Sequence, residues 1–387
     1  MKKKLSILHI STNNIFIKSA FTTFERVFPN NNEVWIFTLD KEIKKPKIKY
    51  NKKFGLIDSL TPTFLNELKK FDIIILHSLE LYWYPFVFLS SKNIKFAWIG
   101  WGYDYQNFIY KNTDSLLHTK TNSLKKKCND HNYISIKHVN KLILKLILII
   151  YNIFISRTVF KKIKSFSPVL KEEYDLIEKT KIIPHLPKFM PWNYGNLEDD
   201  YVKNLFNDKI SGTSILVGNN ASYTNNHIEI FEILGQIQEI SSRKVFVPLS
   251  YGYDCYRTEI LKKGNEMFGQ NFNPIINFMP FDDYINTIKK CGFVIMYHLR
   301  QQSVGVLITM LYLGARVFLM KTNPTYIAFK KIGIIINSTD DMVQDINLLS
   351  KPLEEFEIQI NKSKLRTLWS KDVNDKKTKE LIEYIIE

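Results

Sequence analysis

The sequence predicts an α/β protein built from two consecutive Rossmann-like domains, and three observations support this fold class. Short apolar runs rich in β-branched and aromatic residues alternate with stretches long enough for a helix. Continuous apolar runs of this kind are typical of parallel strands covered by helices on both faces. The alternation restarts after a polar, turn-rich stretch at residues 188–200, and 387 residues are too many for one hydrophobic core.

We expect a first domain at residues 1–195, a second domain at residues 196–365 and a C-terminal helix at residues 366–387. The expected strands divide between the two domains. The first domain's strands are expected at LSILHIS (5–11), EVWIFTL (33–39), FDIIILH (71–77), FAWIGWG (96–102) and IKSFSPV (163–169). The second domain's strands are expected at TSILVGN (213–219), RKVFVPLS (243–250), IINFMP (275–280), GFVIMYH (292–298), ARVFLM (315–320) and IGIIIN (332–337).

The charge is distributed unevenly along the chain. The formal net charge is +16, and residues 1–200 account for most of it, with 32 basic side chains against 18 acidic ones. Such asymmetry suggests a polyanion or an anionic membrane near the first half. A biased nucleotide composition is the alternative, since Lys, Ile, Asn and Phe are all abundant, but that bias should not spare the second half.

The cysteines and the N-terminus indicate an intracellular protein. Cys128, Cys255 and Cys291 lie far apart and form no CxxC pair, which fits a reducing compartment and no zinc framework. The N-terminus is basic, but its apolar run is too short and too strand-like for a secretory signal.

An apolar segment with basic flanks, residues 141–164, has two interpretations. Its apolar run, residues 142–155, is 14 residues long, and a membrane-spanning helix needs about 20. It is either a helix buried in the core or a helix lying at a membrane interface, held by apolar area and flanking cations. The second interpretation assigns membrane or acceptor contact to Lys141, Lys145, Arg157, Lys161, Lys162 and Lys164.

The stretch ILVGNNASYTNNHIEIFEIL (215–234) reads as a strand, a turn and a helix. Gly218 allows close approach to the backbone, and Asn219, Asn220 and Asn225 supply polar groups. Open α/β sheets bind ligands at the carboxyl ends of their strands, and a helix N-terminus favours an anion. The turn matches neither GxGxxG nor GxxxxGK[ST], so hydride transfer and P-loop hydrolysis lose support. The alternative is an Asn-rich turn with a helix cap.

Two further loops are expected at the same edge of the second sheet. The strand VFVPLSYGY (245–253) ends with Ser250 and Tyr251. The stretch YHLRQQSVGVLITMLYLGA (297–315) contains a polar triplet, then Ser303 as an expected helix N-cap and Gly314 as an expected helix stop. A guanidinium suits paired phosphate oxygens, and amides suit sugar hydroxyls. The ligand-facing residues expected in this stretch are Arg300, Gln301, Gln302 and Gly305.

These motifs resemble glycosyltransferase family 56. ILVGN, VPLSY, FDDY, RQQSVGVL and NP occur between residues 215 and 335 in the order and spacing of that family. In the first half, IGWGYDYQNF and the His77 that follows FDIIIL are also similar to family motifs. The resemblance implies a GT-B type glycosyltransferase, with two Rossmann-like domains facing each other across a cleft. It also implies a peripheral enzyme at the cytoplasmic face of the bacterial inner membrane.

The resemblance extends to the substrates. It implies transfer of a 4-amino-4,6-dideoxy sugar, such as N-acetylfucosamine (Fuc4NAc), from a dTDP-sugar donor. The implied acceptor is an undecaprenyl-diphosphate-linked glycan, in the synthesis of enterobacterial common antigen or O-antigen. No cofactor is implied.

The residues allow a mechanism of this kind. The departing pyrophosphate needs positive charge, which Arg300 and helix N-termini could supply. An Asp-x-Asp motif, common in metal-dependent transferases, is absent from the sequence, so a metal-independent reaction is predicted. Asp104 and His77 are the candidates for a base that deprotonates the acceptor hydroxyl, and both are expected at carboxyl ends of first-domain strands. The alternatives are a helix N-cap for Asp104 and a packed, hydrogen-bonded histidine for His77.

Two other classes of function remain open. A non-catalytic sugar-binding protein would have the same two-domain fold with a degenerate site. A nucleic-acid-binding protein would explain the positive charge, but the sequence contains no recognition module, and the polar loops lie in the nearly neutral half. The sequence therefore predicts no nucleic-acid partner.

Overall fold

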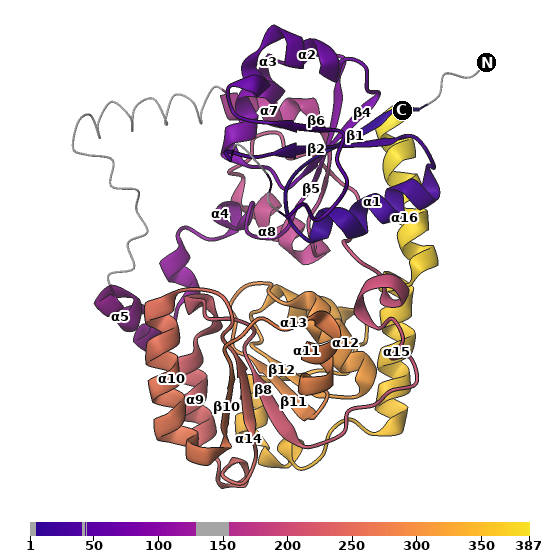
Figure 1. Cartoon of the computed structure of the whole chain (residues 1–387). Helices are drawn as coiled ribbons and strands as arrows, with labels where there is room; N and C mark the ends of the chain where they lie inside the picture. Colours follow the sequence, from indigo (N-terminus) through magenta and orange to yellow (C-terminus); the bar gives the residue numbers. More distant parts are fainter. Residues whose placement is uncertain (1–4, 41–42, 44, 129–154) are drawn as a thin grey trace. The chain divides into compact units, whose positions relative to one another are not determined.

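The chain folds into two α/β units, each with its own parallel sheet (Figure 1). The computed structural model describes residues 5–40, 43, 45–128 and 155–387. The described part of the first unit lies in residues 5–109, 155–196 and 369–387, and that of the second in 110–128 and 197–368. The α/β fold class is confirmed. The boundary after residue 196 is one residue from the expected one, whereas residues 110–128 pack with the second unit and residues 369–387 return to the first.

The sheet of the first unit has seven strands in the order β3-β2-β1-β4-β5-β6-β7, and every pairing is parallel. This is the Rossmann order, with its topological switch point between β1 and β4. The strands are β1 (Ile7–Thr12), β2 (Asn32–Phe37), β3 (Lys52–Phe54), β4 (Ile73–His77), β5 (Lys95–Ile99), β6 (Ile163–Ser167) and β7 (Lys188–Phe189). The sequence pattern missed β3 and β7 because two or three residues are too few for a periodic signal.

The sheet of the second unit has six parallel strands in the order β10-β9-β8-β11-β12-β13, so its switch point lies between β8 and β11. The strands are β8 (Ser214–Val217), β9 (Val245–Pro248), β10 (Phe272–Ile275), β11 (Cys291–Met296), β12 (Arg316–Leu319) and β13 (Asn337–Ser338). The strand expected at residues 275–280 is wrong. Ile275 is buried as the last residue of β10, but the apolar residues after it are turned to solvent, with Ile276 47% and Phe278 85% exposed. The last expected strand, at residues 332–337, overlaps β13 only at its final residue, Asn337.

Helices cover both sheets. In the first unit they are α1 (Phe16–Val27), α2 (Pro62–Leu68), α3 (Tyr84–Leu89), α4 (Gln106–Ile109), α7 (Ser156–Lys162), α8 (Lys171–Thr180) and α16 (Lys371–Ile386). In the second they are α5 (Thr119–Cys128), α9 (His227–Gly235), α10 (Asp254–Phe268), α11 (Phe281–Ile288), α12 (Val304–Leu313), α13 (Pro324–Lys331) and α14 (Thr339–Gln344). The helix α15 (Glu355–Trp369) leads out of the second unit toward α16.

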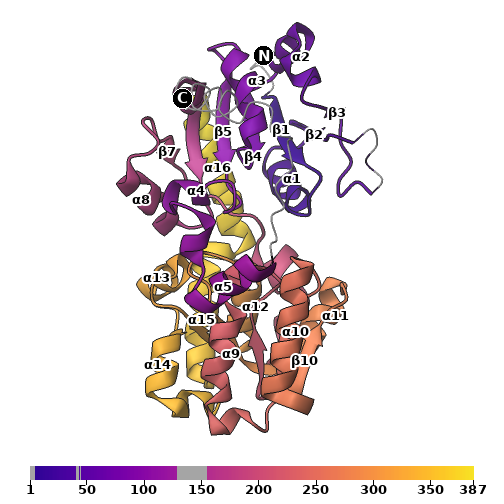
Figure 2. The same ribbon diagram turned by 90° about the vertical axis from the view of Figure 1, so that its left-hand side faces the viewer.

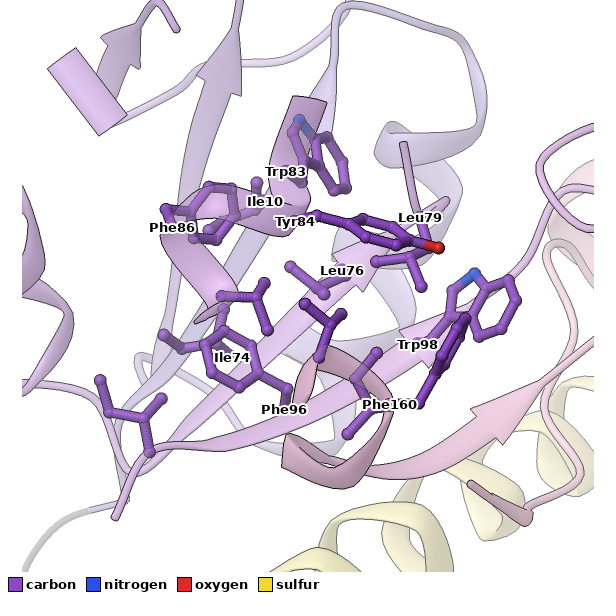
Figure 3. Packing of buried hydrophobic residues seen from close by; sticks show 14 of the residues in the cluster. Ile10, Ile74, Leu76, Leu79, Trp83, Tyr84, Phe86, Phe96, Trp98 and Phe160 are labelled. Carbon is purple, nitrogen blue, oxygen red and sulfur yellow. The ribbon is translucent and has the colours of Figure 1, made fainter. Parts of the chain in front are cut away.

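The core of the first unit is rich in aromatic side chains. Figure 3 shows Trp83, Tyr84, Trp98 and Phe160 packed with aliphatic residues of β1 and β4. Trp98 stacks on Phe166, with ring centroids 3.8 Å apart. This core supports the strand ends that carry the candidate base.

The C-terminal helix completes the other face of the same sheet. Leu381, Ile382 and Ile385 of α16 are buried against residues of β1, β4 and β5. Arg26 of α1 donates to the carboxylate of Asp375, with Nε 2.8 Å from Oδ2. The sequence predicted a helix here, and the structure shows that it belongs to the first unit.

The cysteines differ from the prediction. Cys128, at the end of α5, and Cys255, in α10, form a disulfide with their Cα atoms 5.9 Å apart, while Cys291 is free and buried. The two partners are separated by 127 residues, so only the packing of α5 beside α10 brings them together. The spacing of the cysteines therefore does not support a reducing compartment.

Of the segment at 141–164, only the final residues can be described. Lys141 and Lys145 lie outside the described residues, whereas Arg157, Lys161, Lys162 and Lys164 lie on or just after α7. Across the described ranges, no helix has the length and hydrophobicity needed to cross a bilayer.

Candidate active site

Two loops at the switch point of the second sheet are joined by side-chain hydrogen bonds. Gln302 Nε2, after β11, donates to Asn219 Oδ1, after β8, over 2.7 Å. Thr224 Oγ1 donates to Gln302 Oε1 over 2.9 Å, and the Asn225 Oδ1 lies 2.8 Å from His298 Nε2. Because the amide of Gln302 bonds at both ends, it holds the loops together rather than standing ready for a sugar.

The turn after β8 is further ordered by its own asparagines. Asn220 Oδ1 accepts bonds from Ser222 N at 2.9 Å and from Asn225 Nδ2 at 2.8 Å. Asn219 N donates to Asn225 Oδ1 at 2.9 Å. The Asn-rich turn is therefore a rigid, hydrogen-bonded structure that could present groups to a ligand.

The loop after β9 pairs with this turn. Ala221 N donates to Tyr251 O over 2.8 Å, and Tyr253 N donates to Ala221 O over 2.9 Å. Gly252 has a φ of +131°, and a Cβ there would meet Ala221 O at 2.3 Å. Ser250 is half-buried and Tyr251 is 56% exposed. The structure therefore brings together the three loops that the sequence singled out in this unit.

Gly218 is required by packing inside the protein. Its φ is +66°, and a Cβ would lie 2.4 Å from His227 Nε2 and 2.8 Å from Asn225 Oδ1. The imidazole of His227 is fully buried, and this burial lowers its pKa to about 3, so the ring is neutral. Its Nδ1 lies 3.1 Å from the hydroxyl of Tyr256. The glycine thus lets the start of α9 approach the end of β8.

Arg300 lies on the segment that follows β11 and is partly exposed. Its Nη1 donates to Gln301 O over 3.1 Å, and Gln301 itself is 7% exposed. Asn323 Nδ2 donates to the backbone carbonyls of both His298 and Arg300, each over 2.8 Å. Asn323 and His298 were not among the expected site residues, although the dipeptide NP is a recognisable helix start, with an N-cap followed by proline.

The start of α12 differs from the expectation for Ser303 and gives Gly305 a packing role. Ser303 stands at the N-cap position, but its φ is 60° and its side chain makes no capping bond. A Cβ at Gly305 would lie 3.0 Å from Tyr201 Cε1, so Gly305 makes room for that ring. Gly314 ends the helix in the left-handed conformation with a φ of 101°, as predicted.

Asp104, in the first unit, connects the loops that follow β4 and β5. Its Oδ2 accepts bonds from Leu79 N at 3.0 Å and Trp98 Nε1 at 2.8 Å, and its Oδ1 accepts one from Trp101 N at 2.8 Å. Burial is the largest effect on this carboxyl and raises its pKa from 3.8 to about 6. Asp104 does not cap α4, which begins at Gln106.

Asp104 lines a cavity of about 760 Å³ that lies wholly within the first unit. The walls are mainly aliphatic and aromatic, with carboxylates and one guanidinium among them. The lining residues are Leu79, Glu80, Leu81, Tyr84, Tyr103, Asp104, Asn107, Phe108, Ser156, Arg157, Phe160, Ile182 and Pro184. Its volume is in the range of small-ligand sites.

His77 lies in the interior of the first unit. Its Nε2 is 2.9 Å from His9 Nδ1 and its Nδ1 is 2.8 Å from the Tyr194 hydroxyl, while His9 Nε2 is 3.2 Å from Asn32 Oδ1. Both imidazoles are fully buried, which lowers the pKa of His9 to about 4 and that of His77 well below its usual value. The structure matches the alternative of a packed, hydrogen-bonded histidine, since both nitrogens are engaged away from solvent.

Lys162 was expected to contact a membrane, but its ammonium group binds inside the protein. Its Nζ donates to three backbone carbonyls at the end of α3, at distances between 2.6 and 2.9 Å, and burial lowers its pKa. A cation at a helix C-terminus stabilises the unpaired carbonyls there, so Lys162 has a structural role. Lys161 and Lys164 are exposed, and Arg157 lines the cavity.

Most of the second unit, apart from its N-terminal segment beginning at residue 110, matches a known family. Residues 193–363 match the family described as 4-alpha-L-fucosyltransferase glycosyl transferase group 56. The chain is a glycosyltransferase. Its group 56 region contains all three of the joined loops, whereas Asp104 and His77 lie outside it.

Solved structures that resemble the glycosyltransferase cover both units. A glycosyltransferase from Rickettsia africae matches with a TM-score of 0.61 and 14% identity over 100% of this chain and 99% of that one. HepE from Anabaena, solved with UDP, has a TM-score of 0.63 and 10% identity over 98% and 100%. An α,α-trehalose-phosphate synthase from Burkholderia xenovorans has 0.63 and 8% over 98% of each chain. These similarities confirm the GT-B fold class.

Proposed function

We propose that this glycosyltransferase moves a 4-amino-4,6-dideoxy sugar, such as Fuc4NAc, from a dTDP-sugar to an undecaprenyl-diphosphate-linked glycan. The products would serve enterobacterial common antigen or O-antigen synthesis. One observation carries the proposal: three polar loops are joined by hydrogen bonds at the switch point of the second sheet, inside the group 56 region. Ligands of open α/β sheets bind at that position.

The donor is assigned to the second unit. Arg300 supplies a cation beside the start of α12, where unpaired backbone N–H groups also favour phosphate oxygens. The solved relative HepE contains UDP, which has the same diphosphate chemistry as dTDP. Charge develops on the diphosphate as the glycosidic bond breaks, and Arg300 would stabilise it in that state.

The acceptor hydroxyl is assigned to the first unit, with Asp104 as the base. A pKa of about 6 leaves this carboxyl ionised at neutral pH and more basic than an ordinary aspartate. His77 is the weaker of the two candidates, because both of its ring nitrogens bond to buried partners. We therefore assign His77 a positioning role, through Tyr194.

The proposed reaction uses no metal and no cofactor. Arg300 and the start of α12 would neutralise the leaving group, which is the task that a metal ion performs in other transferases. A chelator should therefore leave turnover unchanged, and turnover that requires added Mg²⁺ or Mn²⁺ would overturn this part of the proposal.

The protein is proposed to work as a peripheral enzyme at the cytoplasmic face of the inner membrane. The exposed cations Arg157, Lys161 and Lys164 suit an anionic leaflet, and the lipid diphosphate of the acceptor is also anionic. Lys162 is left out of this proposed surface, because its ammonium group donates to backbone carbonyls.

The decisive experiment is transfer of labelled sugar from a panel of dTDP- and UDP-sugars to a lipid-linked acceptor. We expect turnover with a dTDP-4-amino-4,6-dideoxy sugar and much less with UDP-sugars. Arg300→Ala is the control, since it should retain the fold and lose turnover. Binding of the nucleotide sugar without any transfer would instead favour a non-catalytic sugar-binding protein.

A further inference from the structure

Three loops at the carboxyl edge of the first sheet carry exposed apolar side chains. The strands β1, β2 and β3 are neighbours in the sheet, and within three residues of their ends stand Ile15, Leu39 and Ile57. These side chains are 68%, 82% and 82% exposed. Neighbouring strands lie about 4.8 Å apart, so the three loops share one edge. We call this surface the apolar edge patch, and its members are Ile15, Leu39, Leu56, Ile57 and Leu60.

The backbone beneath the patch is held in place. Thr38 N donates to Phe54 O over 3.0 Å, which ties the chain after β2 to the end of β3. Gly55 N donates to Asp58 Oδ2 over 2.8 Å, and the neighbouring Ser59 is buried. The apolar side chains are therefore presented outward by an ordered turn.

A basic loop adjoins the patch. Residues 39–60 contain seven lysines and three acidic residues, and Lys45, Lys47, Lys49 and Lys53 are exposed in the structure. Asn13, in the turn that leads to Ile15, accepts a bond from Lys47 N at 2.8 Å and donates to Lys45 O at 3.1 Å. The loop that carries these lysines is thus bonded to the turn that leads to Ile15, and Figure 2 shows the backbone of β3 and α1 in this part of the first unit.

We propose that the apolar edge patch and its lysines dock the protein on an anionic lipid bilayer. Exposed aliphatic side chains with exposed lysines on a neighbouring loop fit the interface between headgroups and acyl chains, where apolar burial and charge act together. A protein partner would need acidic groups around an apolar surface, whereas an anionic leaflet supplies both features over a wide area. This docking surface is separate from residues 141–164.

One ring contact links the end of β2, just before Leu39 of the patch, to the cavity that holds Asp104. Tyr82 stacks on Phe37 at the end of β2, with centroids 4.4 Å apart, and its neighbour Leu81 lines the cavity and is 56% exposed. A bilayer at the patch would therefore lie close to the proposed acceptor side. The closeness of the bilayer to the acceptor matters only if the proposed function is right, but the docking itself does not rest on that function.

Flotation with vesicles tests the docking. The full chain is mixed with vesicles of phosphatidylcholine and phosphatidylglycerol, or of phosphatidylcholine alone. We expect binding to the anionic vesicles, and a loss of about tenfold for the double variant Leu39→Ser, Ile57→Ser. We expect a similar loss for Lys45→Glu with Lys47→Glu. Phe356→Ser is the matched control, because Phe356 is 62% exposed on α15, and it should float like the wild type.

Several outcomes would overturn the proposal. Wild-type flotation by both double variants would do so, as would equal binding to neutral and anionic vesicles. A protein that ignores vesicles but forms dimers that Leu39→Ser with Ile57→Ser dissociates would identify a self-association surface. Transfer of sugar to a water-soluble acceptor, measured in parallel, separates this result from the proposed function, since the patch variants should retain it.

Discussion

The two sheets share one strand order, and each has a histidine at or just after the end of its fourth strand. The hydrogen bonds of these two histidines stabilise different parts of the fold. His77 ends β4, and His298 stands two residues beyond β11. Burial lowers the pKa of both, so both imidazoles are neutral. His77 bonds inward to His9 and Tyr194, whereas His298 bonds to Asn225 in the turn after β8. The same topological position therefore stabilises the interior in one unit and the turn after β8 in the other.

The candidate sites of the two units also differ in their chemistry. The second unit has an edge of amides and one cation, which suits a polar nucleoside diphosphate. The first unit has a largely aromatic and aliphatic cavity containing a carboxylate, which suits a hydroxyl group on an amphiphilic acceptor. Two units with the same strand order thus carry their candidate sites beside different strands, and the loop residues decide the chemistry of each site.

The largest expected effect is that of Arg300→Ala on the donor side. Removing one group that stabilises developing negative charge should lower kcat by about 10²–10³-fold. Steady-state transfer kinetics measure this, with circular dichroism to confirm that the fold is kept. Arg300→Lys should recover part of the rate, because it restores the charge without the paired donors. Wild-type turnover in Arg300→Ala would remove Arg300 from the mechanism.

Asp104→Asn should act on the acceptor side, with a loss of about 10²-fold in kcat/KM. The wild-type rate should rise with pH through about 6 as Asp104 ionises, and the variant should lack this rise. The free energy of unfolding should change in the opposite direction, falling as the pH rises. Since folding raises this pKa from 3.8 to about 6, its contribution to the free energy of unfolding is present below pH 4 and is lost as the pH rises through about 6.

Urea unfolding between pH 4 and pH 7 measures this expected loss of stability. The wild type should lose more stability over this interval than Asp104→Asn does. An unchanged rate profile together with an unchanged stability difference would exclude Asp104 as an ionising group of the site.

Gln302→Ala should have a moderate effect on the donor side, because it breaks the links to Asn219 and Thr224 together. Loss of a buried hydrogen-bonding partner costs about 1–3 kcal/mol, so the donor KM should rise by about tenfold with a smaller change in kcat. Thr224→Ala removes only one of the links and should show a weaker effect of the same kind. A rise in KM that is larger for Thr224→Ala would contradict the role of Gln302.

The smallest expected effect on turnover is that of His77→Phe. This variant removes the bonds to His9 and Tyr194 while filling the space, so it should lower the free energy of unfolding by about 1–3 kcal/mol. The pH profile of kcat/KM should keep its wild-type shape, because His77 does not ionise near neutral pH. A lost limb in that profile would make His77 the base and would break the contrast between the two units.

Local patterns were sufficient for much of the fold. The apolar runs predicted nine strands close to their observed positions, because buried parallel strands need continuous apolar residues. Gly314 was predicted to end α12, since only the left-handed conformation closes that helix. The strand at 275–280 failed because an edge strand is short and the apolar residues after it remain exposed.

By itself the sequence determined the fold class, the three polar loops after β8, β9 and β11, and the identity of Asp104 as a carboxylate after β5. Each follows from residues close together in the chain. Only the tertiary structure decided that Gln302 binds Asn219, that Asp104 accepts three bonds and is raised in pKa, that His77 is closed off by His9, and that Cys128 meets Cys255. These outcomes depend on which atoms meet after strands and helices pack, and on how much water the packing removes, and neither quantity is contained in local spacing.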